Sequence, residues 1–221
     1  MAEIGCVSLK LVCVFPYNSV SKTYVFVYSD SVEPYFSLDY PMLFNYAALG
    51  RTIGDEAGHG FDPNGVKHNY NGTEVDIWTN ETYEYYNSQT QCFVDQYNNI
   101  SIPNSNGYYV NGTRSVTENM PDNGGMQAAY RAWEVYKESN PNEANMILPG
   151  IDLTPDQLYW LQYGRAWCDT WRDDYWLSYT GVHSPRYARL IGTIQNFPQF
   201  ADAYNCPIGS PMNPANKCKI W

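Results

Sequence analysis

Apolar residues recur at helical spacing along five stretches of this chain, and the pattern predicts a mainly α-helical fold with a small β element. Such spacing places one face of a helix against a core. Residues 22–28 are instead β-branched and aromatic, which is typical of a strand, and residues 30–41 indicate an irregular connection. The predicted helices are 43–60, 78–97, 118–138, 157–167 and 186–204.

Cap and turn residues delimit these helices. Gly60 is a suitable end for the first, and the polar stretches 62–73 and 98–114 predict loops. Thr154, with Gln157 three residues later, predicts a capping box at the start of the fourth. The side chains expected to face the core include Tyr85, Tyr86, Phe93, Tyr97, Leu158 and Leu161.

Length and charge restrict the possible partners. The chain has 221 residues, which is enough for one domain with a real core, and no linker or repeat divides it. Its net charge of −10 disfavours nucleic acid and anionic membrane surfaces as partners. No run of 18 apolar residues predicts a transmembrane segment. Residues 1–16 contain Glu3 and Lys10 and no basic leader, so they do not predict a clear signal peptide.

Sequons and cysteines indicate an extracellular chain or ectodomain. Four Asn-x-Ser/Thr sequons lie within a polar stretch, at Asn71, Asn80, Asn99 and Asn111. The six cysteines are widely spaced and none forms a Cys-x-x-Cys pair, which favours disulfides over a thiol metal site. They are Cys6, Cys13, Cys92, Cys168, Cys206 and Cys218.

Residues 54–62 read Gly-Asp-Glu-Ala-Gly-His-Gly-Phe-Asp, a His-Glu-x-x-His pattern with aspartate in place of the first histidine. In the intact pattern two histidines four residues apart reach one zinc ion, and the glutamate faces the metal-bound water. Glu56 and His59 keep their places, whereas Asp55 offers a short carboxylate. A chance match to Glu-x-x-His is common, so the spacing alone settles little.

Further motifs along most of the chain resemble a single protein family. The C-terminal part, with His183-Ser184-Pro185, Arg189, Gly192, Met212-Asn213-Pro214 and 217–221 (Lys-Cys-Lys-Ile-Trp), resembles the neprilysin and endothelin-converting-enzyme family of zinc metallopeptidases. Residues 118–125 (Glu-Asn-Met-Pro-Asp-Asn-Gly-Gly), Leu148-Pro149-Gly150 and Trp167-Cys168 extend it. The resemblance covers 17–221 as a neprilysin-like C-terminal peptidase domain and leaves 1–16 as a divergent N-terminal segment.

This resemblance implies a thermolysin-like (gluzincin-type) catalytic subdomain that cuts oligopeptides with zinc held by two histidines and a glutamate. Matched position by position, His59 and Glu118 resemble two of the ligands, and Asp55 stands at the third. Glu56 resembles the general base, Asp122 the carboxylate that orients the first histidine, and His183 the group that stabilises the oxyanion. Arg189 resembles the substrate-binding arginine and Trp167 a wall of the side-chain pocket. The resemblance also implies a Cys92–Cys218 disulfide, and it gives Cys168 and Cys206 partners upstream of this chain.

Departures from the family pattern weigh against activity. Asp55 and Asp122 are two carboxylates that repel each other unless metal or a shared proton lies between them. Pro121 follows the ligand Glu118, and it costs about 3 kcal/mol within a helix interior but little if the helix begins near residue 120. Gly58 costs roughly 1 kcal/mol relative to alanine in the active helix.

The N-terminal region departs as well. The family's Asn-Ala substrate-binding pair is replaced by Val14 and Phe15, and the long upstream part of the family's ectodomain has no counterpart in the sequence.

Three functions remain open at this point. The first is a neprilysin-like metalloendopeptidase homologue whose zinc chemistry is absent or strongly impaired. The second is a non-catalytic protein that binds peptides or a partner through the same cleft. The third is an active endopeptidase in which Asp55 ligates zinc. The sequence leaves open the substrate, the oligomeric state and whether the chain is part of a longer one.

Overall fold

The structure of the chain is a computed structural model, and it describes residues 17–18, 23–24, 33–76, 78–105, 107–168 and 173–220. A short antiparallel pair, β1 (Tyr17–Asn18) and β2 (Thr23–Tyr24), precedes the helices, with Tyr17 opposite Tyr24. The helices are α2 (Met42–Asn45), the π-helix η2 (Tyr46–Gly50), α3 (Arg51–Gly58), the 3-10 helix η3 (Gly65–Lys67), α4 (Asn80–Asn98), α5 (Gly112–Ser139), α6 (Pro141–Ala144), α7 (Pro155–Ala166), α8 (Asp173–Ser178), α9 (Arg186–Ile194) and α10 (Pro198–Ala203).

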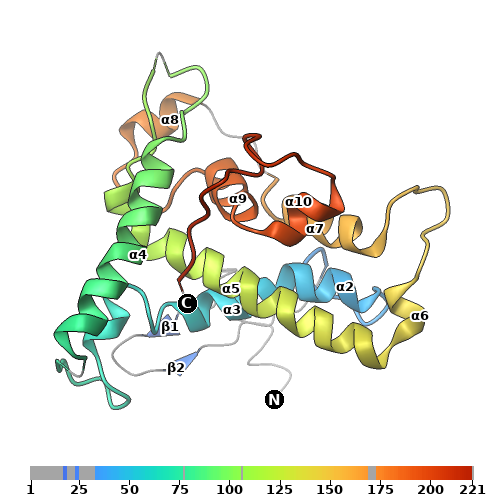
Figure 1. Cartoon of the computed structure of the whole chain (residues 1–221), viewed down its shortest axis with the longest axis horizontal. Helices are drawn as coiled ribbons and strands as arrows, with labels where there is room; N and C mark the ends of the chain where they lie inside the picture. The colour runs from blue at the N-terminus through green and yellow to red at the C-terminus, as the bar shows by residue number, and fades with distance from the viewer. Residues whose placement is uncertain are drawn as a thin grey trace, which may run out of the picture.

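Helix α5 is the long central helix of the fold. It runs across the molecule in Figure 1, and α3, α4 and α9 all pack against it. Helices α2, η2 and α3 follow one another without a break, with every intervening residue in the right-handed helical region. Helix α7 packs against α2 and η2, and it also packs against α10. This arrangement brings the middle of α5 against the end of α3 and the start of α9.

Glycines allow α3 and α5 to approach closely. A Cβ atom on Gly54 would lie 2.6 Å from the Gly125 carbonyl oxygen, and one on Gly125 would lie 2.2 Å from the Asp55 nitrogen. One turn further along, a Cβ on Gly58 would lie 2.9 Å from the Pro121 Cα atom. The two positions that weaken these helices locally, Gly58 and Pro121, therefore face each other where the helices touch.

Two apolar clusters lie at opposite ends of α5 and leave a polar layer between them. The first cluster contains Val116 and Met120 of α5, and the second contains Met126, Tyr130 and Trp133. Between them lie the buried polar residues Asn119, Asp122 and Asn123, with Thr193 from α9. A buried polar layer of this kind is costly unless its members are paired, so it marks where function is expected.

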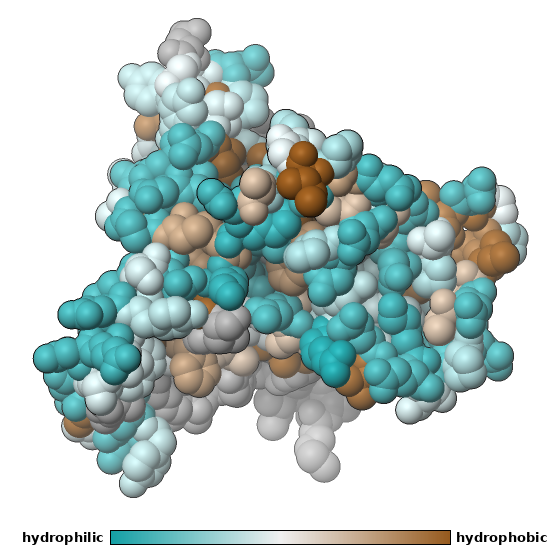
Figure 2. Space-filling view, viewed as in Figure 1, coloured by the Kyte–Doolittle hydropathy of each residue, from teal (hydrophilic) through white to brown (hydrophobic). Residues whose placement is uncertain are grey.

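The surface agrees with the acidic composition. Hydrophilic residues cover most of the face in Figure 2, and apolar residues appear there as separate patches. The sequon residues Asn71, Asn80, Asn99 and Asn111 are all exposed. Within the ranges described above, no helix is long and apolar enough to cross a membrane.

The mainly helical prediction is confirmed, with corrections. The predicted segment 186–204 is broken at 195–197 into α9 and α10, and α6 and α8 were not predicted. The capping box at Thr154 and Gln157 is present. Helix α5 begins at Gly112 and not at Glu118, because Asn111 caps it with a side-chain hydrogen bond to the Arg114 nitrogen. Residues 112–114 are therefore helical, and Pro121 lies in a helix interior. Tyr85 and Leu161 are 52% exposed each, so both expected core positions were wrong, whereas Tyr86, Phe93, Tyr97 and Leu158 are buried.

One disulfide ties the C-terminal tail to α4. Cys92 and Cys218 are bonded across a sequence separation of 126 residues, as the family resemblance implied. Cys168 and Cys206 are free cysteines in the described part of the chain. Cys6, Cys13, Val14, Phe15 and most of the predicted strand 22–28 lie outside the described residues.

Candidate active site

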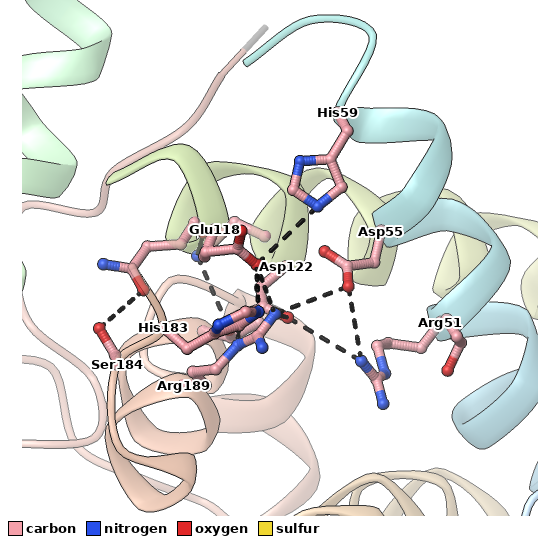
Figure 3. A network of polar contacts seen from close by, with 12 residues as sticks. Arg51, Asp55, His59, Glu118, Asp122, His183, Ser184 and Arg189 are labelled. Carbon is pink, nitrogen blue, oxygen red and sulfur yellow. Dashed lines mark hydrogen bonds and ion pairs between the residues drawn. The ribbon is translucent and has the colours of Figure 1, made fainter. Parts of the chain in front are cut away.

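Three helices and one loop bring the candidate residues together in the polar layer (Figure 3). Arg51 and Asp55 lie one turn apart on α3, and Glu118 and Asp122 lie one turn apart on α5. Residues four apart share a helix face, so each helix presents a pair of charges to the other. The remaining members are His59 at the C-cap of α3, His183 in the loop before α9, and Arg189 on α9.

His59 is oriented by Asp62. Nδ1 of His59 hydrogen-bonds to Oδ2 of Asp62 at 2.8 Å, while Oδ1 of Asp62 accepts from the Asn64 and Gly65 nitrogens at 2.7 Å each. The ring therefore turns Nε2 toward Glu118, whose Oε2 lies 3.9 Å away. Burial lowers the pKa of His59, but the Asp62 hydrogen bond and the charges of Asp55 and Glu118 outweigh it and raise the pKa to about 9.

Glu118 is the point at which Arg189 and two histidines converge. Its Oε2 lies 3.1 Å from Nε2 of His183, 3.7 Å from Nη2 of Arg189 and 3.9 Å from Nε2 of His59. Burial favours the neutral carboxyl, yet the His183 hydrogen bond and the Arg189 charge prevail and lower the pKa of Glu118. The loop that carries His183 is held by Ser184, whose hydroxyl donates to Oδ1 of Asn119 at 3.0 Å.

Asp122 and Arg189 form a buried pair with two parallel hydrogen bonds. Nε of Arg189 donates to Oδ2 of Asp122 at 2.5 Å, and Nη2 donates to Oδ1 at 2.9 Å. Asp122 is fully buried and Arg189 is 9% exposed. Complete burial and the nearby Asp55 raise the pKa of Asp122, although Arg189 opposes the rise. This fork geometry is the strongest form of carboxylate recognition by arginine.

Asp55 lies between two guanidinium groups. Its Oδ2 is 3.6 Å from Nη2 of Arg189 and 3.8 Å from Nη1 of Arg51, and the same Arg51 nitrogen is 3.9 Å from Oδ1 of Asp122. Oδ1 of Asp55 is buried and has no hydrogen-bond partner among the described residues. Two arginines thus oppose the expected repulsion between Asp55 and Asp122, although Asp55 still contributes to the raised pKa of Asp122.

Trp167 contacts both arginines. The guanidinium carbon of Arg51 lies 4.5 Å from the centre of its ring system, and that of Arg189 lies 4.8 Å away. Both distances are within the range of cation–π attraction, and Trp167 is 7% exposed. The predicted wall of a side-chain pocket is therefore packed against the charge network itself.

The structure gathers seven of the eight family-implied residues into this network or against it. The eighth, Glu56, is buried on α3 at 8% exposure. Two further residues were given no role from the sequence, namely Arg51 and Asp62. The signal for Arg51 was its four-residue spacing from Asp55, and that for Asp62 was its place three residues after His59.

A small cavity of about 160 Å³ opens beside His183. Four aromatic residues, Tyr108, Tyr109, Trp176 and Tyr179, line it together with aliphatic and polar side chains. Tyr108 and Tyr109 are 63% and 56% exposed, so these rings are accessible from solvent. Rings of this kind can bind apolar side chains while their hydroxyl groups face water.

Comparison with known protein families accounts for this arrangement. The model of peptidase family M13 matches residues 16–220, which is nearly the whole chain. The chain belongs to peptidase family M13. Neprilysin of Mus musculus is 41% identical over 207 residues, and endothelin-converting enzyme 1 of Rattus norvegicus is 36% identical over 207 residues. The match covers 93% of this chain in both cases but 27% and 26% of those proteins, so the chain spans about a quarter of their length.

Solved structures share this fold. The Haemonchus galactose-containing glycoprotein complex has a TM-score of 0.85 with 31% identity, and it covers 94% of this chain and 35% of its own. A zinc metalloprotease of Mycobacterium tuberculosis in its open state has a TM-score of 0.83 with 25% identity over 94% of this chain and 32% of its own. These matches agree with a mainly helical, thermolysin-like M13 fold.

Zinc, the metal of M13 metalloproteases, does not fit these residues as they lie. Zinc ligands in proteins converge on the ion at about 2.0–2.3 Å, whereas Oδ2 of Asp55 is directed at two guanidinium groups. In the described ranges, no three His, Cys, Asp or Glu side chains are arranged to hold a metal ion. Unit charges about 4 Å apart interact by roughly 4 kcal/mol at an effective dielectric of about 20. Each arginine thus opposes a cation by a sizeable part of the roughly 10–16 kcal/mol with which structural zinc binds.

Proposed function

We propose that this chain is an M13 homologue whose zinc-dependent hydrolysis of oligopeptides is lost or strongly impaired. The observation that carries the proposal is the environment of Asp55, which stands at the position of the first histidine of the motif. Its carboxylate is within 3.8 Å of both Arg51 and Arg189. Asp55 is therefore engaged by cations of the protein, and the chain carries one imidazole where two are expected.

The remaining family residues keep their relative places in this proposal. His59, with Asp62 behind it, and Glu118 are the remnants of a metal site, and Glu56 is the remnant of the general base. Arg189 and Asp122 act as a buried structural pair, since both parallel hydrogen bonds of the arginine go to that carboxylate. His183 lies on Glu118, at the edge of the aromatic cavity.

The same proposal includes an extracellular, N-glycosylated protein. It rests on the four exposed sequon residues and on the Cys92–Cys218 disulfide, which persists in oxidising compartments. Mass spectrometry before and after enzymatic removal of N-glycans, on protein secreted from eukaryotic cells, tests this part. Absence of glycan at all four sequons would contradict it.

The test of impaired chemistry combines metal analysis with a peptidase assay. Purified protein is dialysed against zinc chloride, freed of excess metal and analysed for zinc, and its hydrolysis of short apolar peptides is measured beside an active M13 relative. We expect far less than one zinc per chain and no hydrolysis above background. Stoichiometric zinc with chelator-sensitive turnover that is lost in Glu56→Gln would establish a working peptidase with Asp55 as a ligand.

A second candidate function, peptide binding without cleavage, is favoured by the aromatic cavity beside His183. Binding of an apolar peptide there needs no metal, so it should survive a chelator. Tyr179→Ala, at the cavity wall, should weaken binding, whereas Tyr70→Ala, an 88% exposed tyrosine away from the cavity, should not. Equal binding by both variants, or no binding of any peptide from a mixed pool, would eliminate this candidate. Arg189→Ala is a poorer probe because it also breaks the buried pair with Asp122.

A further inference from the structure

Arg51 is a buried cation one helical turn before Asp55, the residue that stands where the family resemblance expects a metal-binding histidine. It is 7% exposed and lies on α3. Its ion pairs in the described part of the chain are with Asp55 and Asp122, and its guanidinium lies against the Trp167 ring. A long charged side chain is rarely buried unless it is paired, so this position is held by its two carboxylate partners.

The charges of Arg51, Asp55, Asp122 and Arg189 balance when both carboxylates are ionised. Asp55 and Asp122 carry one negative charge each when ionised, and Arg51 and Arg189 carry one positive charge each. All four are at most 9% exposed, and Figure 3 shows the two guanidinium groups meeting the two carboxylates. Arg189 is already committed to Asp122 by two hydrogen bonds. Arg51, 3.8 Å from Oδ2 of Asp55, adds the second positive charge that the two carboxylates need.

We infer that Arg51 supplies the positive charge that a metal ion would otherwise bring to Asp55, and that it excludes zinc from this site. The inference rests on the proposed loss of zinc chemistry, and it names Arg51 as a cause of that loss. Asp55 and Arg51 then act together, because the carboxylate at the position of the first histidine is matched by an arginine one turn earlier on the same helix.

The pairing of Arg51 with Asp55 has a consequence that loss of a ligand alone would not have. Asp55→His restores the ligand type, but it removes the carboxylate that Arg51 faces. The site then holds two guanidinium groups beside a single buried Asp122 carboxylate, and its net charge rises by one. A dication should be opposed more strongly than before. Restoring zinc therefore requires that the Arg51 charge be removed together with Asp55.

The experiment measures zinc affinity, with zinc chloride as the probe, by competition with a chromophoric chelator. The proteins are wild type, Asp55→His, Asp55→His/Arg51→Gln, Asp55→His/Arg51→Lys and Asp55→His/Arg131→Gln. The glutamine keeps length and polarity without charge, and the lysine keeps the charge. Arg131 is a surface arginine paired with Glu134 at 3.3 Å, so its loss controls for one positive charge removed elsewhere.

We expect three variants to bind zinc weakly, namely Asp55→His, Asp55→His/Arg51→Lys and Asp55→His/Arg131→Gln. Asp55→His/Arg51→Gln should bind roughly ten- to a hundredfold more tightly, the range by which groups around a metal's ligands change affinity. If Asp55→His and Asp55→His/Arg51→Gln bind zinc with equal affinity, whether tight or weak, the role of Arg51 is overturned while the proposed function stands. Stoichiometric zinc in active wild type would overturn the proposed function instead.

A measurement on single variants applies if the double variants fail to fold. The melting temperature of wild type should not change when a chelator is added, because Arg51 already supplies the charge. Arg51→Gln should lower it more than Arg131→Gln does, since it leaves a buried carboxylate without its partner. A chelator-induced drop in wild type, or no greater loss in Arg51→Gln than in Arg131→Gln, would overturn the inference.

Discussion

At the scale of single residues, ion pairs connect the members of the site. Asp55 lies with Arg51 and Arg189, and Asp122 takes both parallel hydrogen bonds of Arg189. Replacing one partner of such a buried set leaves an uncompensated charge, which typically costs more than the pair contributes. The residues therefore stabilise one another as a group, and the effect of a single substitution on stability includes the effect on its partners.

Gly58 gives a prediction that opposes helix propensity. Alanine is preferred over glycine in a helix by roughly 1 kcal/mol, but a Cβ atom at this position would lie 2.9 Å from the Pro121 Cα atom. We expect Gly58→Ala to destabilise the protein by roughly 1–3 kcal/mol, as measured by chemical unfolding. Gly164→Ala is the matched control, because its Cβ meets only Leu190 at 3.9 Å. It should be neutral or stabilising, and equal effects of the two would contradict the close contact.

His59 gives a prediction about pH. Its pKa is about 9 in the folded protein and about 6.5 when unfolded. A raised pKa stabilises the folded state fully below pH about 6.5, and that contribution is lost as the pH rises through about 9. With a chelator present, the stability difference between wild type and His59→Gln should shrink by roughly 1–3 kcal/mol over this range. Asp62→Asn should reduce the same dependence, and a pH-independent difference would contradict the assigned shift.

At the scale of secondary structure, α5 decides the geometry of the site, because it carries both Glu118 and Asp122. It spans 28 residues with Pro121 in its interior, where the missing N–H removes one backbone hydrogen bond. Gly58 of α3 has no side chain at this contact, so Pro121 fits against it. Packing between the helices thus outweighs the local preference of each.

The N-terminus of α5 gives the next prediction. Asn111 caps the helix through a hydrogen bond at 2.9 Å from the Arg114 nitrogen to its side chain. Asn111→Ala should lower the free energy of unfolding by about 1 kcal/mol. Asn111→Asp removes the sequon equally but keeps the acceptor, so it should stay within about 0.5 kcal/mol of wild type. Equal losses in both variants, measured without glycan, would show that the cap contributes nothing.

The helices could be predicted from the sequence wherever apolar periodicity was strong, as in α4, α7 and α9. The start of α5 was missed because residues 112–117 are small and polar and because Pro121 suggested a later beginning. Leu161 was expected in the core, yet it is 52% exposed although the buried Leu158 lies only three residues before it. Local pattern does not reveal which face a neighbouring helix covers.

The residues of the site were identified by their resemblance to a family, and spacing alone would not have assembled them. Glu118 and Asp122 look like ordinary acidic residues near a helix start until His183 and Arg189 are placed against them. Arg51 was overlooked because its partner Asp55 was considered as a failed ligand. Its role depends on contacts between three helices, which no local pattern contains.

At the scale of the whole molecule, two apolar clusters hold α5 from its two ends and the charge network occupies the layer between them. The C-terminal tail closes the first cluster, to which Cys218 and Ile220 both belong. The disulfide to Cys92 of α4 fixes the tail there. The environment of the site therefore depends on segments more than a hundred residues apart.

Removal of this disulfide should destabilise the whole fold. Cys92→Ala with Cys218→Ala should lower the free energy of unfolding by roughly 2–5 kcal/mol, because the link closes a long loop in the unfolded chain. Cys168→Ala, at an exposed free cysteine, is the control and should change it by less than about 0.5 kcal/mol. A loss confined to the control would mean that the tail contributes little to the core.

The most direct test of the central claim is an anomalous-scattering map at the zinc edge, from crystals of wild-type protein soaked in zinc chloride. The account predicts no ordered ion between His59 and Glu118, with the Arg51 and Arg189 guanidinium groups against Asp55 as in Figure 3. A fully occupied ion bound by Asp55, His59 and Glu118, with Arg51 displaced from Asp55, would contradict it.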